Sequence, residues 1–183
     1  NLSHFKLWYA QAGTPTLTVT SHYDAAAKKF HLTIRQDIPD TPGQANKKPM
    51  HIPVATGLLG KNGKDLLEGG TRILHLVEKE QTFVFDGIAE KPVPSVLRGF
   101  SAPVKLKTDL SDDDLLFLMA HDSDGFNRWD SGQTYLQRLI LSMASGGAKK
   151  MPQACLDAFG ALIKDTAADR ALLAKALSLP SET

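Results

Sequence analysis

The chain has 183 residues, which suits one or two domains, and its 42% of hydrophobic residues is enough to build a packed core. With 21 basic and 20 acidic residues the formal net charge is +1, so the charge balance gives no reason to expect nucleic acid or an anionic membrane as a partner. Cys155 is the only cysteine, which excludes an intrachain disulfide and a cysteine zinc cluster, and no apolar run approaches the roughly 20 residues of a membrane span.

Residues 1–13 resemble the last part of a helix. Phe5, Leu7 and Trp8 supply its apolar side chains. Gly13 is expected to terminate the helix, and Pro15 forbids its continuation. The segment is therefore predicted to be the tail of a domain that lies upstream.

Residues 14–108 have the pattern of a sheet protein. Apolar and polar residues alternate with a period of two, which marks half-buried strands, because successive side chains point to opposite faces. The candidate strands are 16–23, 30–35, 50–59, 72–78, 82–86 and 95–107. The first two are joined as a hairpin by residues 24–29, and Asn62-Gly63 marks a tight turn. Short strands separated by Gly and Pro turns favour an antiparallel sandwich of about seven strands.

Residues 109–183 have a helical period. Ser111 and Asp114 have the spacing of a capping box, and aspartates 112–114 fill the first turn, where the helix dipole favours negative charge. The second helix is expected to end at residues 145–147. Its predicted core face consists of Phe126, Trp129, Gln133, Leu136, Ile140 and Met143.

Two further helices are expected after a short connection. One runs from Pro152, at the first helical position, to Lys164, and it places Cys155 among apolar neighbours as a buried residue. The other starts near Thr166, with Asp169 completing its cap. Sequential helices with short connections favour a bundle or the start of a solenoid.

The sequence contains no local pattern for hydrolytic chemistry. None of the six histidines precedes a glutamate and no two lie three to five residues apart, so the zinc-hydrolase motif H-E-x-x-H is missing. Gly60-Lys61 and Gly63-Lys64 lack the earlier glycine of a phosphate-binding loop, and no G-x-S-x-G elbow occurs. We predict no catalytic and no metal-ligating residue, although a zinc site assembled from distant positions stays an open alternative.

The segment 121–130, HDSDGFNRWD, is the strongest remaining candidate for a site. As a calcium loop it has Asp122 and Asp124 at suitable positions, but Phe126 and Asn127 replace the third ligand and the glycine. We therefore favour a helix junction over a calcium site.

In a helix junction the same residues have structural roles. One residue of the range 122–124 would cap the new helix. Phe126 and Trp129 would anchor its core face, while Arg128 and Asp130 would lie on other faces. A buried tryptophan needs a partner for its N–H, which predicts a local polar network.

Two motifs resemble the M1 family of zinc aminopeptidases. WYAQAGTP, residues 8–15, is similar to the end of that family's catalytic domain, and DSDGFNRWD, residues 122–130, is similar to a D-S-D-x-F-N-R-W-E segment near the start of the helical domain in bacterial members. HIPVATGL, EQTFVFDGI and SAPVKL also resemble these members, and the similarity covers nearly the whole chain in order. Asp130 stands where the family more often has Glu, and Gly125 often where it has Pro.

The resemblance implies an immunoglobulin-like or fibronectin-like β-sandwich followed by the start of a helical solenoid. It divides the chain into residues 1–13 as the tail of the catalytic domain, 14–108 as the sandwich and 109–183 as a truncated helical domain. The family's zinc ligands, catalytic glutamate and transition-state tyrosine lie upstream, so none is assigned here. The motif positions with an expected structural or interface role are Trp8, Gln11, Gly13, Pro15, Phe126, Asn127, Arg128, Trp129 and Asp130.

The leading hypothesis is a non-catalytic fragment of a zinc aminopeptidase that removes N-terminal residues from peptides. The fragment would be a spacer and part of the wall that restricts substrate access, without a cofactor of its own, and zinc would belong to the parent enzyme. Its partners would be the parent's remaining domains, with peptides reached only through the full enzyme, no nucleic acid and no membrane. The single thiol fits a reducing compartment and hence the cytoplasm.

The alternative is a free-standing module that binds a protein partner through its sandwich and helices. A fragment should expose apolar surface where lost neighbours packed, and Leu7, Trp8, Leu172 and Leu173 are the candidates. An enzyme with an unrecognised site has no positive support in the sequence.

Overall fold

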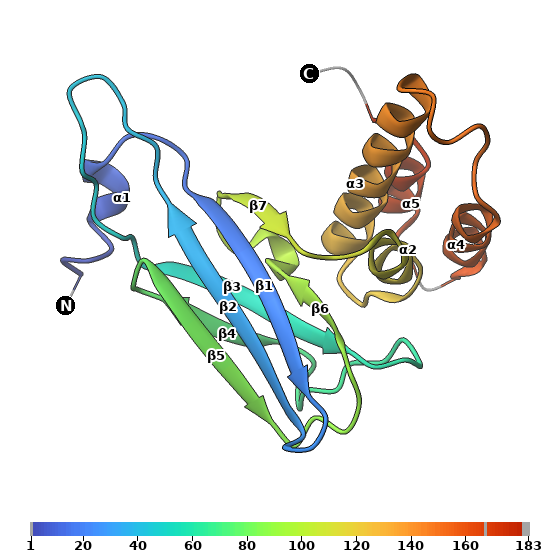
Figure 1. Cartoon of the computed structure of the whole chain (residues 1–183), viewed down its shortest axis with the longest axis horizontal. Helices are drawn as coiled ribbons and strands as arrows, with labels where there is room; N and C mark the ends of the chain where they lie inside the picture. Colours follow the sequence, from blue (N-terminus) through green and yellow to red (C-terminus); the bar gives the residue numbers. More distant parts are fainter. Residues whose placement is uncertain (1, 167, 181–183) are drawn as a thin grey trace. The chain divides into compact units, whose positions relative to one another are not determined.

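The computed structural model describes residues 2–166 and 168–180, which form two compact units (Figure 1). The first unit comprises the residues up to Lys61 together with Leu66–Asp109. The second comprises Asn62–Asp65 and the residues from Leu110 onward. Within the described residues, no helix combines the length and the apolar character needed to span a membrane.

The first unit begins with one helical turn, α1 (Leu7–Ala10). The chain leaves the helix at Gln11, which is already extended, so the helix ends before the residue that we expected to terminate it. Gly13 lies in the following loop, where its positive φ of 95° favours glycine. A Cβ at this position would stand 3.3 Å from Pro39 Cγ, so the loop also approaches its neighbour closely.

The rest of the first unit is a sandwich of two sheets, which confirms the predicted architecture of about seven strands. The strands are β1 (Thr16–Asp24), β2 (Lys29–Asp37), β3 (Ile52–Leu59), β4 (Arg72–Leu76), β5 (Glu80–Asp86), β6 (Val93–Val96) and β7 (Lys105–Thr108). One sheet has the order β5-β2-β1-β7 and the other β4-β3-β6. The pairs are antiparallel, as expected, except that β7 runs parallel to β1.

The core of the sandwich follows the period-two pattern. Leu17 and Val19 of β1 are buried, as are Phe30, Leu32 and Ile34 of β2, while the residues between them are more exposed. β3 is the central strand of its sheet and is buried at every position except Pro53. That burial explains why its sequence is an almost continuous apolar run.

The candidate strand 95–107 is in fact two strands. A short 3-10 turn, η1 (Arg98–Phe100), separates β6 from β7, and the two strands belong to different sheets. Leu97 and Phe100 take positive φ values of 63° and 52° as the chain crosses between the sheets. A strand prediction based on alternation missed this crossing, because the apolar residues continue through it.

The second unit has four helices: α2 (Asp112–His121), α3 (Gly125–Ala144), α4 (Gln153–Lys164) and α5 (Arg170–Ala176). The predicted capping box is present, since Ser111 Oγ accepts from Asp114 N at 3.1 Å and Asp114 Oδ2 accepts from Ser111 N at 3.1 Å. Pro152 was predicted to be the first helical residue of α4, but it is the N-cap, so the helix begins one residue later, at Gln153. Asp169 is itself the N-cap of α5, so this helix starts later than residue 166.

The buried face of α3 differs from the predicted one. Ile140 and Met143 belong to the predicted face but are 43% and 42% exposed. Leu136 of the predicted face is buried, and the helix also buries Asn127, Arg128, Ser131, Gly132, Tyr135 and Leu139. A Cβ on Gly132 would lie 3.2 Å from Met119 Sδ, so a small residue allows α2 to approach α3. The predicted face was wrong at Ile140 and Met143 because the prediction considered only large apolar side chains. It overlooked small residues such as Gly132, which allow two helices to pack closely.

Candidate functional site

The DSDGFNRWD motif forms the junction between α2 and α3. Asp124 is the N-cap of α3 and accepts a hydrogen bond from Asn127 N at 2.9 Å. Asp122 Oδ1 accepts from Asp124 N at 2.9 Å and shapes the turn before the helix. Ser123 Oγ donates to Asp65 Oδ2 at 2.8 Å and fixes the segment 62–65 to the junction. Of the three candidate caps, Asp124 is therefore the one that caps the helix.

Arg128 connects three helices from a buried position. Its side chain is 9% exposed, so the expectation that it lies away from the core was wrong. Nε donates to Met119 O and one terminal nitrogen to Ala120 O, both at 3.2 Å, in the last turn of α2. The other terminal nitrogen lies 2.6 Å from Asp165 Oδ2, at the C-cap of α4. A guanidinium satisfies helix-terminal carbonyls and complements the negative end of the helix dipole, which is why a cation is stable here.

The aromatic residues of the motif lie beside Arg128. Trp129 is half-buried and packs against the helical core, and the ring centroid of Phe126 lies 5.7 Å from that of Trp129. Lys175 Nζ of α5 stands 5.5 Å from the centre of the Trp129 ring, a cation–π distance. Asn127 is only 6% exposed. The motif therefore contributes side chains to the interior of the helical unit.

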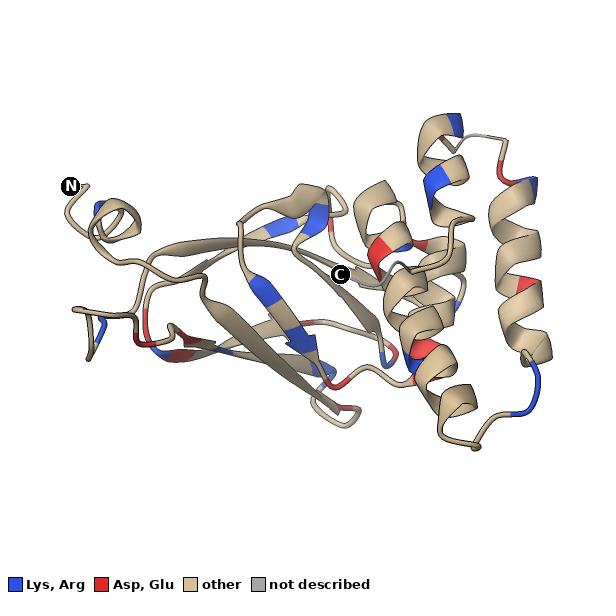
Figure 2. Cartoon of the chain, turned by 90° about the horizontal axis from the view of Figure 1, so that it is seen from above, with Lys and Arg blue, Asp and Glu red and all other residues tan. Residues whose placement is uncertain are grey.

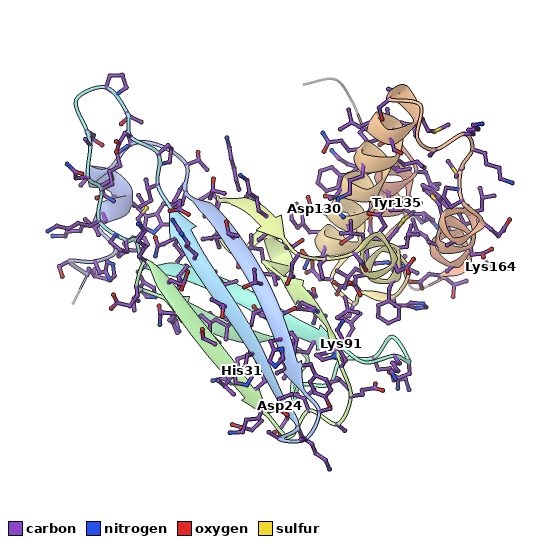
Figure 3. All side chains as sticks on the ribbon, in the orientation of Figure 1. Asp24, His31, Lys91, Asp130, Tyr135 and Lys164 are labelled. Atoms are coloured by element: carbon purple, nitrogen blue, oxygen red, sulfur yellow. The ribbon has the colours of Figure 1, made fainter. Side chains whose placement is uncertain are left out.

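The pKa of Asp130, at the end of the motif, is shifted. Burial raises the pKa of its carboxyl group, because the charged form is poorly solvated. Asp130 and Tyr135 are both carried by α3 (Figure 3).

A cavity of 590 Å³ lies next to the junction and is polar in character. The ionisable side chains that line it are those of His121, Asp122, Arg128, Asp165 and Asp169. The carboxylates have structural partners: Asp122 holds the turn, Asp165 pairs with Arg128, and Asp169 caps α5. Ser123 also lines the cavity, but its hydroxyl donates to Asp65 Oδ2 at 2.8 Å, which is the structural contact that fixes segment 62–65.

Metal and thiol chemistry find little support in the described part of the chain. Within residues 2–166 and 168–180, no group of three or more His, Cys, Asp or Glu side chains is arranged to hold a metal ion. Cys155 is fully buried in the helical core, as predicted, and burial raises the pKa of its thiol. A thiol in this position is a packed small hydrophobe and not a nucleophile.

The N-terminal motif is hydrogen-bonded to the loop that precedes β3. Trp8 Nε1 donates to His51 O at 2.9 Å. Gln11 makes two bonds to the backbone of Lys48, donating to its O at 2.9 Å and accepting from its N at 2.7 Å. Pro15 is buried at the start of the sandwich, and its O accepts from Lys105 N where β7 joins β1. The motif residues thus attach the N-terminal segment to the residues before β3 and to the start of β7.

Sequence reasoning missed several buried polar residues. Gln36 is 2% exposed and bonds both backbone groups of Met50, at 2.8 Å each, and Glu78 O at 2.9 Å. Lys47 Nζ donates to Ala12 O and Pro39 O, at 2.6 Å each. One signal was available: Gln36 occupies the position where β2's alternation calls for an apolar residue.

Replacing Trp129 by Ala is expected to destabilise the helical unit by about 2 kcal/mol, less than the 3–5 kcal/mol of a fully buried aromatic. The loss removes its packing on the core and its contact with Lys175. Thermal unfolding followed by helical circular dichroism measures it, with Phe126→Ala as a milder comparison. An unchanged midpoint in Trp129→Ala would contradict the structural role of the motif.

Comparison with known families matches both parts of the chain. DUF3458, described as a domain of unknown function with an Ig-like fold, matches residues 13–109. DUF3458_C, described as ARM repeats, matches residues 112–183.

Curated relatives match along the whole chain. It is 43% identical to aminopeptidase N of Escherichia coli over 99% of its length, and 46% identical to aminopeptidase N of Caulobacter vibrioides over 100%. The chain spans 22% and 21% of these relatives. Among solved structures, Legionella pneumophila aminopeptidase A in complex with aspartic acid matches with a TM-score of 0.86 and 30% identity, over 98% of this chain and 20% of that one.

Proposed function

Since the chain belongs to the DUF3458 family, with an Ig-like domain followed by the ARM-repeat domain of DUF3458_C, we propose that it is a non-catalytic structural part of an aminopeptidase N-like zinc exopeptidase. The observation that carries this proposal is that the motif residues make structural contacts within the fold. Arg128 ties three helices together and Trp8 ties the N-terminal segment to the sandwich, so the residues that resemble the enzyme family hold the fold. The relatives' much greater length supplies room for a catalytic domain elsewhere.

In the parent enzyme of the M1 family, zinc would polarise the scissile carbonyl and activate water for removal of N-terminal residues from peptides. The present chain would contribute a spacer and part of the wall around the substrate path. We propose residues 1–13 as the tail of the catalytic domain, 14–108 as the sandwich domain and 109–183 as the start of the helical domain. Basic and acidic residues are interspersed over the chain (Figure 2), which fits protein neighbours and not a nucleic-acid surface. The single buried thiol fits a cytoplasmic enzyme.

Exposed apolar residues support a role inside a larger protein. Leu2, Phe5 and Tyr9 follow helical spacing and are 68%, 46% and 84% exposed. Ile163 on α4 and Leu179 after α5 are 57% and 67% exposed. Such side chains are expected where further domains and further helices of a repeat array pack.

The particular residues differ from those that the sequence suggested. Leu7 and Trp8 pack against the sandwich core, and Leu173 packs against the helical core. Leu172 is half-buried and contacts Gly125. A free-standing interaction module stays the alternative, and it would need only one of the exposed faces for its partner.

A direct assay separates the proposal from an independent enzyme. The isolated chain should show no turnover of a chromogenic aminoacyl substrate with zinc added, and metal analysis after dialysis should find no stoichiometric zinc. Turnover that co-purifies with the chain would overturn the proposal.

A hydrophobic dye separates it from the free-standing module. The isolated chain should bind the dye strongly, and replacing Phe5 and Tyr9 by Ser should reduce that binding. A chain without dye binding would instead favour the module.

A further inference from the structure

The N-terminal segment is held on the sandwich by side chains from one of its faces. His4 Nε2 lies 2.7 Å from Pro49 O, Trp8 Nε1 donates to His51 O, and Gln11 bonds the backbone of Lys48. All of these bonds go to backbone groups of the short segment 48–51, just before β3. Phe5 and Tyr9 point elsewhere and are exposed.

Three histidine rings meet where this segment is attached. His51 Nε2 lies 2.9 Å from Nδ1 of His75 on β4, with ring centroids 5.1 Å apart. The ring of His4 lies 6.1 Å from that of His51. The rings therefore come from three separate parts of the chain, residues 4, 51 and 75.

The chemistry of this cluster depends on protonation. Two neutral imidazoles can share one hydrogen bond, because one ring nitrogen donates and the other accepts. When both rings are charged each nitrogen carries a proton, so no acceptor remains and the two positive charges repel. His51 and His75 both belong to the sandwich, so the repulsion reaches residues 2–12 through a charged His4, whose ring lies 6.1 Å from that of His51.

We propose that the His4–His51–His75 cluster is a proton-sensitive latch that holds residues 2–12 on the sandwich at neutral pH and releases them as the pH falls. The latch concerns this chain alone. If the proposed function is correct, it also couples the tail of the catalytic domain to the sandwich, and that extension rests on the proposed function.

The surroundings of His51 favour its neutral form. Burial lowers the pKa of His51, and so do the positive charges that His75 and His4 would carry. No carboxylate is among the groups that shift this pKa within the described residues. Lys6 and Lys48, on the two joined segments, are exposed, while Lys47 is held by Ala12 O and Pro39 O. The added charges nearby are thus positive.

The sign of the pH effect follows from this lowered pKa. Release of residues 2–12 separates His4 from His51 and exposes His51, which relieves two of the causes that lower its pKa, while His75 stays beside it in the sandwich. The pKa of His51 is then closer to its ordinary value near 6.5, so the open state binds a proton more readily. The closed state is then fully stable above about pH 6.5 and loses stability as the pH falls through the range down to the lowered pKa. The ratio of open to closed segment rises about tenfold per pH unit for each proton that only the open state binds.

Trp8 fluorescence tests the latch. In Trp129→Phe, Trp8 is the sole tryptophan, since the chain has two. Acrylamide quenching of Trp8 should increase as the pH falls from about 7.5 to about 5.5, around the ordinary histidine pKa, while the sheet signal in circular dichroism stays constant. Quenching that is equal across this range, or a sheet signal lost in parallel with it, would overturn the latch.

Histidine variants assign the effect to the cluster. His51→Gln/His75→Gln should remove the pH dependence, and His75→Gln alone should weaken it if the double variant does not fold. His22→Gln/His31→Gln is the matched control, because this cross-strand pair on β1 and β2 also brings two histidine rings together, with centroids 6.1 Å apart, but lies in the sheet that does not contain β4. The control should retain the unmodified profile. A pH dependence that survives in His75→Gln at full size, or disappears in the control, would contradict the proposal.

Discussion

Arg128→Ala is expected to lower the stability of the helical unit by about 3–5 kcal/mol, the usual cost of removing one partner of a buried ion pair. The substitution leaves Met119 O and Ala120 O without their donor at the end of α2. It also leaves Asp165, 33% exposed, without its 2.6 Å ion pair. Three helices lose their shared contact, so the effect should extend beyond the first turn of α3.

Urea unfolding followed by helical circular dichroism measures this loss, and hydrogen exchange shows which helices lose protection. Arg138→Ala is the matched control on the same helix. Arg138 also bonds a carbonyl and an aspartate, Leu110 O and Asp112, but its side chain is 41% exposed and that of Asp112 is 60% exposed. Exposed pairs contribute about 0–1 kcal/mol, so the control should change little. Equal losses in the two variants would argue against the role of Arg128.

Gly57→Ala is expected to destabilise the sandwich by about 3 kcal/mol, from overpacking and from lost hydrogen bonds to a charged group. A Cβ at Gly57 would overlap the guanidinium of Arg98, which is 6% exposed and lies across the strand. Arg98 donates to Ser95 Oγ at 2.8 Å, Gly70 O at 3.0 Å and Thr71 Oγ1 at 3.1 Å. Because these bonds fix the guanidinium, it cannot move aside without losing them.

A double-mutant cycle isolates the clash. In an Arg98→Ala background, Gly57→Ala should cost much less than in the unmodified chain, with a coupling energy of about 1–3 kcal/mol. Gly160→Ala serves as the comparison for an added methyl group, since nothing lies within 4 Å of a Cβ there and the residue is inside α4. The free energy of unfolding of that variant should increase by about 0.5–1 kcal/mol. Additive losses at Gly57 and Arg98 would rule out the steric explanation.

The predictable part of the fold depended on local chemistry. The hairpin of β1 and β2 followed from alternation, because one face of each strand is buried. The start of α2 followed from Ser111 and Asp114, because a capping box acts within four residues. Both features depend on residues that are close together in the sequence, so tertiary context did not change them.

The candidate site was predictable in its position and not in its bonds. The resemblance pointed to Trp8 and to the DSDGFNRWD segment, and both lie at junctions of the structure. The burial of Arg128 was not foreseeable, because its partners lie 8 to 37 residues away and include two backbone carbonyls. Every residue has a backbone carbonyl, so the sequence does not indicate which carbonyl accepts a hydrogen bond from a distant side chain.

The sequence by itself determined the succession of a sandwich and a helical unit, the capping box of α2 and the absence of a local zinc-hydrolase motif, because each depends on periodicity or on spacing over a few residues. Only the tertiary structure decided which polar side chains became internal. Gln36, Arg98 and Arg128 are buried because distant carbonyls and carboxylates satisfy them, and the transfer of the chain from β6 to β7 depends on packing between two sheets. The meeting of His4, His51 and His75 is of the same kind, since residues 24 and 47 positions apart come together only when the sandwich folds.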